Sequence, residues 1–516
     1  MKKIRYSLLI LLGAVTLSSC NNWLDVLPDN EQVTDDYWKS KEDVEAVLAS
    51  GYYYMRNTVP QMIRWGELRG GTLYSNNTAD IPMQNFMLTA TSSICDYSNV
   101  YKIINMANSV LKYAPLVKLQ DETYYTSVMQ SHLAEAYFMR AFSYFLLVRN
   151  YRDVPLVLQA YVNDDASYEI AKSPDSVIVA QIKEDITAAL ATGAAKETYE
   201  EDWQTKGRVT KWALYALMAD VCLWSEDYDG CITYSNEILN ATASFRPVFM
   251  QDPSAWFTIF NPGNSNESIF ELNWNNQTYG ETNNFGSYFT VDISSRLKYT
   301  DVALAKFKAE TDEVKANNPT LEGRFGRTLL GSYVHAGTNI SDYKTATQYY
   351  VWKYRGTNVA DIENVRTAQD ANFIIYRVAD IMLMKAEALI LKGQDNWPAA
   401  LSIINQIRER AYLKPLTVET SELDELDMLK LVLYEREMEL SAEGKRWYDL
   451  LLFGKLKNYK YKEQFINMVV EGNQTTNPEW LRSVLKSNDA LYMPIPQSEI
   501  IANPLLVQNP YYATTK

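Results

Sequence analysis

Two stretches of the sequence combine aromatic rings with amide and carboxyl side chains, without the periodic spacing of a helix or a strand. Tryptophan and tyrosine join a flat apolar body to a polar edge, which suits hydrated recognition surfaces as well as cores. We expect the two patches to hold one ligand together, and ordinary loop packing is the alternative for any single ring. The candidate residues are Trp65, Tyr74, Asn76 and Asp80 in the early patch and Trp274, Asn276, Tyr279, Asn283, Phe285 and Tyr288 in the central patch.

The sequence holds few side chains that could catalyse a reaction or bind a metal ion. It has only two histidines, His132 and His335, without the paired spacing of a zinc site. It lacks the nucleophile turn of serine hydrolases, the phosphate-binding loop and the dinucleotide-binding glycine motif. No pair among its 63 acidic residues stands out as a glycosidase pair. The residues therefore give no positive support for catalysis, and we expect no metal and no cofactor.

Both patches need a rigid frame, and the sequence predicts one made mainly of helices. Apolar residues recur every three or four positions in two segments, which indicates amphipathic helices. They are Leu133, Tyr137, Ala141, Tyr144 and Val148 in the first segment and Ile375, Ala379, Met382, Ala386 and Leu389 in the second. From about Ala241 to Tyr350 the periodicity is lost, and we expect long loops there.

Two segments resemble each other and predict tetratricopeptide-like helical hairpins. Trp212 to Leu239 and Tyr376 to Ile407 each run as a helix, a polar turn and a second helix, with small residues at matching positions. Residues 122–190 fit a further pair, while the full repeat signature is absent. The expected fold class is mainly α, a frame of such hairpins with long irregular loops and minor β structure that carry the ligand site. Whether the hairpins form a regular superhelix stays open.

Composition and charge limit the class of protein. Of the 516 residues, 47% are hydrophobic and 22% are charged, which is typical of a packed globular chain. The formal net charge of −14 disfavours binding to nucleic acid. Cys95, Cys222 and Cys231 have no redox-motif spacing, and we expect them to be buried free thiols.

The first twenty residues predict export and lipid attachment. Three basic residues precede an apolar run, Leu8 to Leu17, that is too short to span a bilayer. The run ends at Ser18-Ser19-Cys20, which fits a bacterial lipoprotein cleavage site. We expect residues 1–19 to be removed and Cys20 to be lipidated; an ordinary signal peptide is the alternative. The lipid would be the only membrane attachment.

Six blocks of sequence, in order, resemble the SusD/RagB family of outer-membrane nutrient-binding lipoproteins, and the likeness covers nearly the whole chain. Each block is weak by itself, but their common order makes the resemblance specific. The blocks are Trp23-Leu24-Asp25 with Tyr37-Trp38, Arg140-Ala141-Phe142 with Asp153-Val154-Pro155, Arg377-Val378-Ala379-Asp380, Asn405-Gln406-Ile407-Arg408, Glu435-Arg436 with Arg446-Trp447, and Pro494-Ile495-Pro496 with Gln508-Asn509-Pro510.

Parts of these blocks predict structure rather than chemistry. Charges of alternating sign surround a helix end, which suits a partly buried ion-pair network. The prolines of the last block restrict the backbone and predict an extended strap across the helices. The charged residues are Glu435, Arg436, Glu439, Arg446 and Asp449.

The resemblance implies a cell-surface binding protein without catalysis. In that family the lipoprotein covers a SusC-type TonB-dependent outer-membrane transporter and captures an oligosaccharide, or less often a peptide, before import. The two patches have suitable chemistry, since sugar rings present apolar C–H faces to aromatic rings and hydroxyls to amides. The implied partners are the transporter and the oligosaccharide. The implied location is the outer membrane, where Cys20 anchors a surface-exposed protein.

The expected organisation is a signal peptide at 1–19, an N-terminal helical region at 20–240, and a loop-rich insertion with a C-terminal helical region at 241–516, forming one compact unit. A transporter-associated glycan-binding lipoprotein is favoured. A peptide-binding RagB-like protein, a surface-anchored glycan hydrolase and a helical scaffold that binds only protein are the alternatives. The residues do not identify the glycan.

Overall fold

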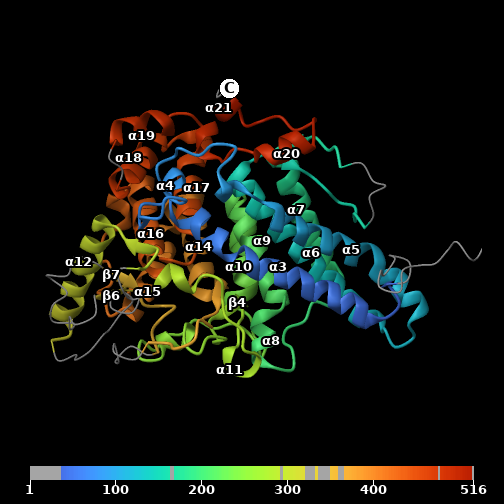
Figure 1. Ribbon diagram of the computed structural model, residues 1–516. Coiled ribbons are helices and arrows are strands. Elements are labelled where there is room, and N and C mark those ends of the chain that lie inside the picture. The colour runs from blue at the N-terminus through green and yellow to red at the C-terminus, as the bar shows by residue number, and fades with distance from the viewer. Residues whose placement is uncertain are drawn as a thin grey trace, which may run out of the picture.

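The computed structural model describes residues 37–162, 168–290, 294–319, 332–334, 349–357, 365–474 and 477–513. Helices dominate this part of the chain and strands are short, so the expected mainly α fold is confirmed (Figure 1). The expected signal peptide, Cys20 and His335 lie outside the described residues. Within the described ranges, no helix is both long and apolar enough to cross a membrane.

Long helices form the N-terminal half, and α6 lies at its centre. The helices are α3 (Lys41–Glu67), α5 (Ser98–Gln120), α6 (Thr126–Tyr151), α7 (Asp175–Ala191), α8 (Asp202–Gly207), α9 (Lys211–Trp224) and α10 (Tyr228–Leu239). Because α3, α5, α7 and α9 all pack against α6, every residue from Phe138 to Tyr151 is buried. The predicted apolar stripe is therefore narrower than the buried surface of α6. Two members of the predicted stripe, Leu133 and Tyr137, are only partly buried.

The three predicted hairpins are confirmed, as α6 with α7, α9 with α10, and α14 with α15. The C-terminal helices are α14 (Val378–Lys392), α15 (Trp397–Arg410), α16 (Glu425–Glu439), α17 (Arg446–Tyr459), α18 (Lys462–Gly472), α19 (Pro478–Leu485), α20 (Gln497–Ala502) and α21 (Pro510–Ala513). Because α10 also packs on α14, two hairpins are neighbours in space. The small residues Ala219, Cys231, Ala386 and Ala400 are fully buried, which lets these helices approach closely.

The predicted free thiols are also confirmed, since Cys95, Cys222 and Cys231 are buried and unpaired. The predicted proline strap is confirmed as well. The backbone N–H of Met493 donates to the carbonyl oxygen of Asn150 at 2.7 Å, and that of Gln497 donates to Ala90 at 2.8 Å. The strap runs across the top of the helices in the view of Figure 1.

The central region contains more regular structure than its sequence predicts. Four two-stranded antiparallel sheets pair β1 (Leu73–Ser75) with β5 (Leu297–Tyr299), β2 (Val154–Pro155) with β3 (Lys172–Ser173), β4 (Ser268–Leu272) with β8 (Phe373–Arg377), and β6 (Ser332–Val334) with β7 (Tyr349–Val351). The other helices are α4 (Ile81–Gln84), α11 (Asn276–Tyr279) and α12 (Asp301–Asn317). The expectation of loops throughout is wrong for α12. The buried face of α12 includes the polar residues Glu310 and Thr311. They interrupt the apolar periodicity from which a helix would be predicted.

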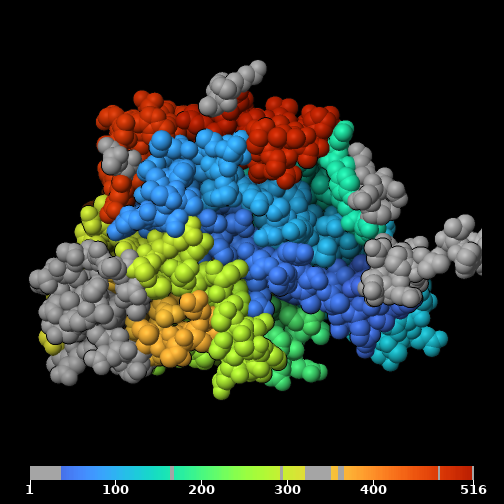
Figure 2. Space-filling model, viewed as in Figure 1, coloured from blue at the N-terminus to red at the C-terminus, as the bar shows by residue number. Residues whose placement is uncertain are grey.

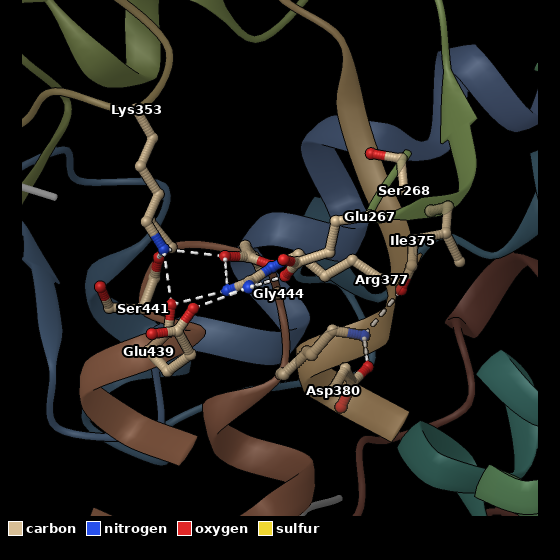
Figure 3. A network of polar contacts seen from close by, with 12 residues as sticks. Glu267, Ser268, Lys353, Ile375, Arg377, Asp380, Glu439, Ser441 and Gly444 are labelled. Atoms are coloured by element: carbon tan, nitrogen blue, oxygen red, sulfur yellow. Dashed lines mark hydrogen bonds and ion pairs between the residues drawn. The ribbon is translucent and has the colours of Figure 1, made fainter. Parts of the chain in front are cut away.

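A buried cluster of charges joins the central region to the C-terminal helices (Figure 3). The guanidinium of Arg377, at the end of β8, lies 3.1 Å from Glu267, 2.7 Å from Glu439 and 2.9 Å from Glu443. The Lys353 ammonium lies 2.8 Å from Glu443, and Arg410 lies 2.5 Å from Glu267 and 2.6 Å from Glu439. Burial alone would raise the pKa of Glu443, but Arg377 and Lys353 hold this pKa below its usual value.

The ion-pair network predicted around the end of α16 is confirmed, and it is more deeply buried than expected. Arg436 lies 3.0 Å from Asp380 and 2.8 Å from Asp449, and Arg446 lies 2.7 Å from Glu437. Of the other two predicted acidic residues, Glu435 lies 4.0 Å from Arg408, and Glu439 belongs to the Arg377 cluster.

The end of α3 is fixed against the turn that follows α16. The Glu67 carboxylate accepts a hydrogen bond from the backbone N–H of Gly444 at 2.7 Å, and burial raises the pKa of Glu67 to about 8. A Cβ atom on Gly66 would lie 1.9 Å from the carbonyl oxygen of Gly444, so only glycine fits there. The early patch follows directly after this junction, and its position depends on it.

We predict that Arg377→Met destabilises the protein by about 3–5 kcal/mol, because it leaves buried carboxylates without their partner. Urea unfolding followed by circular dichroism measures the change. Arg246→Met is the matched control; this arginine is exposed, so its loss should change stability by less than about 0.5 kcal/mol. Equal stability of both variants would contradict a structural role for the cluster.

Candidate ligand-binding surface

One partly exposed face of α3 connects the two predicted patches. Arg56, Pro60 and Arg64 are spaced by four residues on this face, and each is partly exposed. Arg56 and Arg64 are eight residues apart, so their positions are separated by about 12 Å along the helix axis. Each arginine contacts a different patch. In Figure 2 the blue surface that includes α3 crosses the middle of the molecule, below the red C-terminal residues.

The first cavity on this face, here called the Trp203 groove, has a volume of about 390 Å³. Its walls come from the first half of α3, from α8, and from the residues after β4. The lining includes Tyr52, Tyr53, Arg56, Trp203, Arg208 and Asn273. Tyr53 is 59% exposed and Trp203 is 47% exposed, so two large rings are available to a ligand.

Fixed polar groups surround the Trp203 groove. The Arg208 guanidinium lies 2.6 Å from the buried carboxylate of Glu135, which also accepts a hydrogen bond from the Tyr52 hydroxyl at 2.5 Å. The amide nitrogen of Asn273 donates to the carbonyl oxygen of Trp203 at 2.7 Å and ties the two walls together. The amide oxygen of Asn273 has no hydrogen-bond partner among the described residues. That oxygen is a ready acceptor, because an unpaired buried polar atom is costly.

Arg56 connects this groove to the central patch. Its guanidinium lies over the Trp274 ring, 4.9 Å from the ring centre, and 3.0 Å from the Glu281 carboxylate. The side-chain amide of Asn284 donates to the Arg56 carbonyl oxygen at 3.2 Å. These contacts hold the segment around α11 against α3.

The second cavity, here called the Tyr74 cleft, has a volume of about 210 Å³. It is lined by Tyr74, Asn76, Asn77, Ser294, Ser295, Arg296 and Lys298. The antiparallel pairing of β1 with β5 places Tyr74 opposite Lys298. Burial, followed by the field of Asp301, raises the pKa of Tyr74. Asn76 and Asn77 are exposed, so this cleft offers one ring edged by amides and cations.

Asp80 organises the Tyr74 cleft from below. Its buried carboxylate accepts two hydrogen bonds from the Arg296 guanidinium, both at 2.7 Å, and one from the Ser75 hydroxyl at 2.8 Å. Arg64 of α3 lies 3.6 Å from the same carboxylate. Asp80 is fully buried, so its part in the site is to position Arg296 rather than to meet the ligand.

The structure accordingly places the two patches along α3 and not across a single pocket. The early patch meets residues 294–298, and the central patch meets Arg56. Four of the sequence-predicted residues are at least partly exposed. They are Tyr74, Asn76, Asn276 and Tyr279, the last of which is 67% exposed.

The expectation that Trp65 belongs to a ligand-binding loop is wrong. Trp65 lies in the last turn of α3 and is fully buried. Its ring N–H donates to the carbonyl oxygen of Ile94 at 2.8 Å, and its ring packs edge-on against Tyr151. The helix continues two residues past Trp65, further than the loop-like composition of this stretch indicates.

Phe285 is likewise a core residue and not a ligand contact. It is fully buried, with ring contacts to Trp274, Phe289, Tyr354 and Phe373. Trp274 is 8% exposed, between Phe285 and the Arg56 guanidinium, and reaches solvent only at its rim.

Two further predicted residues have structural roles. Tyr288 is buried beneath the Arg296 guanidinium, which lies 4.8 Å from its ring centre. Asn283 is buried and its amide donates to the carbonyl oxygen of Ala371 at 3.1 Å. Both residues shape the surface from underneath.

Sequence reasoning missed Tyr53, Arg56, Trp203 and Asn273. A signal for Tyr53 was present, because Tyr52, Tyr53 and Tyr54 follow one another in a helix, where successive side chains point about 100° apart. Three consecutive rings cannot all face the core. Trp203 carried no comparable signal, since its exposure follows from where α8 packs.

The described residues contain no group of three or more His, Cys, Asp or Glu side chains arranged to hold a metal ion. His132 is buried in α6, where its ring is hydrogen-bonded to the Tyr124 hydroxyl at 2.9 Å. The α3 face presents exposed rings, amides and paired arginines, and these groups are suited to binding a ligand.

Comparison with protein families gives two matches. Residues 251–512 match the family model described as SusD family. Residues 22–223 match the model described as starch-binding associating with outer membrane. The two models together cover most of the chain and agree with the resemblance seen in the sequence.

Individual relatives extend over the full length. The chain is 25% identical to SusD-like protein P2 of Formosa agariphila over 99% of this chain and 100% of the relative. It is 25% identical to SusD-like protein P38 of the same organism over 87% of this chain and 91% of the relative.

Solved structures share the fold. A SusD superfamily protein from Bacteroides vulgatus gives a TM-score of 0.72 at 21% identity, covering 92% of this chain and 99% of that protein. A laminarin-binding SusD-like protein gives a TM-score of 0.67 at 21% identity, covering 92% of this chain and all of that protein.

We predict that replacing two tryptophans near α3 changes the stability of the protein by very different amounts. Trp65→Ala should cost about 3–5 kcal/mol, because it opens a cavity in the core. Trp203→Ala should change the stability by less than about 0.5 kcal/mol, because this ring is half exposed. Urea denaturation of both variants measures the difference. A strongly destabilised Trp203→Ala would mean that Trp203 is a packing residue and not a free face of the groove.

Proposed function

The chain belongs to the SusD family, and on that premise we propose that it captures an oligosaccharide along the exposed face of α3. SusD family proteins bind without catalysing a reaction, so the chain is a binding protein and not an enzyme. The observation that carries the proposal is the pairing of exposed rings with amides in two cavities, one lined by α3 and one that Arg64 of α3 supports through Asp80.

The chemistry of both cavities supports a saccharide as ligand. Tyr53 and Trp203 offer ring faces to the apolar C–H side of a pyranose, and Tyr74 offers a third. Asn76, Asn77 and the unpaired amide oxygen of Asn273 offer partners for hydroxyl groups. A structural neighbour described as laminarin-binding and a family model named for starch binding support the same ligand class.

The spacing of the cavities supports a chain of linked sugars over a single ring. Arg56 borders the Trp203 groove, and Arg64 supports the Tyr74 cleft through Asp80. The two arginines are about 12 Å apart along α3. A ligand that contacts rings in both cavities must reach from one cavity to the other, which favours several linked sugars. Specificity for one glycan would come from hydroxyls that match the fixed amides, since each unmatched buried partner costs about 1–3 kcal/mol.

We further propose that the protein is anchored by lipid at Cys20 and delivers its ligand to a SusC-type transporter in the outer membrane. The N-terminal sequence and the family model that names association with the outer membrane support this location. The full-length likeness to SusD-like proteins supports the partner. In this arrangement the α3 face holds the sugar until the transporter takes it.

Binding is tested by titration calorimetry of the wild-type protein against panels of oligosaccharides and peptides. We expect one oligosaccharide class to bind with millimolar to micromolar affinity, about 4–8 kcal/mol in total. Trp203→Ala and Tyr74→Ala should each weaken it by about five- to tenfold, because each removes a ring worth on the order of 1 kcal/mol.

Phe245→Ala is the control for this experiment, since Phe245 is 67% exposed and lines neither cavity. Unchanged affinity in both Trp203→Ala and Tyr74→Ala would exclude the α3 face as the site. Saturable binding of peptides alone would replace the oligosaccharide by a peptide ligand.

The anchor is tested by Cys20→Ser, which should move the protein from the membrane fraction to the soluble fraction because no acyl chain can be attached. Ser18→Ala keeps a small residue before the cysteine and should leave the protein in the membrane fraction. Digestion of intact cells with protease then reports exposure at the surface. Membrane association of Cys20→Ser without an acyl group would contradict the lipid anchor.

A further inference from the structure

A separate cavity of about 240 Å³ lies away from the α3 face, between α5, the segment after β2 and the C-terminal strap. Four tyrosines line it: one directly before α5, one in its first turn, and two in the segment that leads to β3. They are Tyr97, Tyr101, Tyr161 and Tyr168. Its volume is below the roughly 300–1,000 Å³ of pockets for drug-sized molecules, so its ligand is small. The segments that form it meet near α20 in Figure 1.

Hydrogen bonds between distant parts of the chain hold this cavity open. The side chain of Asn105 both donates to the carbonyl oxygen of Tyr161 and accepts from its N–H, each at 2.8 Å. The Tyr101 hydroxyl donates to the carbonyl oxygen of Pro155 at 2.9 Å. The amide of Asn503 donates to the carbonyl oxygen of Ile170 at 2.8 Å. The walls are therefore fixed before any ligand binds, which lowers the entropy cost of binding.

The tyrosine rings are arranged in two pairs. The Tyr97 and Tyr101 ring centres are 5.1 Å apart, and those of Tyr161 and Tyr168 are 4.9 Å apart. Tyr97 is buried and Tyr168 is 52% exposed, so the rings lead from the floor of the cavity to its mouth. The negative faces of aromatic rings attract cations, and cages of such rings recognise substituted ammonium groups.

The only carboxylate among the lining residues is Glu499 of α20, which is half-buried. It makes no hydrogen bond or ion pair through its side chain with the described residues, in contrast to the buried carboxylates of the Arg377 cluster. Burial, followed by the like charge of Asp96, raises the pKa of Glu499. Partial burial of the Glu499 carboxylate costs free energy, and no cation of the described residues offsets this cost.

Carboxylates act on the pKa values of the groups that line the cavity. After burial, the Glu499 charge is a cause of the raised pKa of both Tyr97 and Tyr101, and Asp96 adds to it at Tyr97. No lysine or arginine in the described part of the chain counters these shifts at Glu499, Tyr97 or Tyr101. A cation that enters the cavity would therefore meet the tyrosine rings and the negative charge of Glu499, which no lysine or arginine of the described residues offsets.

We propose that this tyrosine cavity binds a small ligand carrying an ammonium group, with the ammonium held between Glu499 and the tyrosine rings. The site is independent of the oligosaccharide surface on α3, with which it shares no lining residue. Two sources carry this chemistry: a free quaternary amine such as choline, and an amino sugar such as glucosamine.

The test is calorimetric or NMR titration of the full mature protein with choline and with glucosamine. Each probe is paired with an uncharged analogue: the carbon isostere of choline, and glucose. We expect at least one ammonium probe to bind saturably and its uncharged analogue to bind at least about tenfold more weakly, because the analogue loses the cation–π and charge terms. The probe that binds identifies the source.

Glu499→Gln should weaken binding of the ammonium probe by about tenfold, since it removes the charge and keeps the shape. Tyr168→Ala, at the exposed mouth, should weaken it as well. Glu479→Gln is the matched control, because Glu479 is an exposed carboxylate on the C-terminal helix α19 and lines no part of the cavity. Oligosaccharide binding on α3 should be unchanged in all three variants.

Three results would overturn the proposal. They are the absence of saturable binding for both ammonium probes, equal affinity for a probe and its uncharged analogue, and full affinity of the probe for Glu499→Gln. Equal affinity for glucosamine and glucose would instead identify a neutral sugar pocket. Failure of the oligosaccharide titration alone would leave this inference intact, because the two sites are measured with different ligands.

Discussion

The buried cluster around Arg377 is the interaction on which the arrangement of this protein depends. Three cations, Arg377, Lys353 and Arg410, and three carboxylates, Glu267, Glu439 and Glu443, are enclosed together. Such charges are tolerable in a low-dielectric interior only when each one finds its partners in good geometry. The segments that carry them must therefore assemble as a set: the residue before β4, the residues after β7, the ends of β8 and α15, and the turn after α16.

This constraint reaches the proposed ligand-binding surface through a short series of contacts. Glu443 belongs to the cluster, and the next residue, Gly444, is hydrogen-bonded to Glu67 at the end of α3. The close approach of Gly66 to Gly444 leaves no space for a side chain. With the end of α3 fixed there, the chain that follows turns into β1 and pairs with β5, which forms the Tyr74 cleft. The binding surface is thus held in place by the ion pairs and the close backbone contact beneath it.

Burial separates the aromatic residues of this protein into different roles. Trp65, Phe285 and Tyr288 are buried and support the surface, whereas Tyr53, Trp203 and Tyr74 keep exposed or partly exposed faces. The tyrosine cavity near α20 has a different character from the α3 face, because its carboxylate is unpaired while the arginines along α3 are paired with Asp80 and Glu281. Two binding chemistries can therefore coexist on one frame without competing for the same groups.

The sequence by itself determined the helical hairpins, the buried thiols, the ion-pair network and the family, because these follow from local periodicity and from motifs in a fixed order. It also indicated Tyr74 and Asn76 as candidates, and they lie in β1 and directly after it. Only the tertiary structure decided which rings are exposed. Trp65 and Trp203 are the same residue type, but one packs against Tyr151 of α6 and donates to Ile94, while the other borders a groove between α3 and α8. Exposure is set by the packing of distant elements, and no local pattern carries that information.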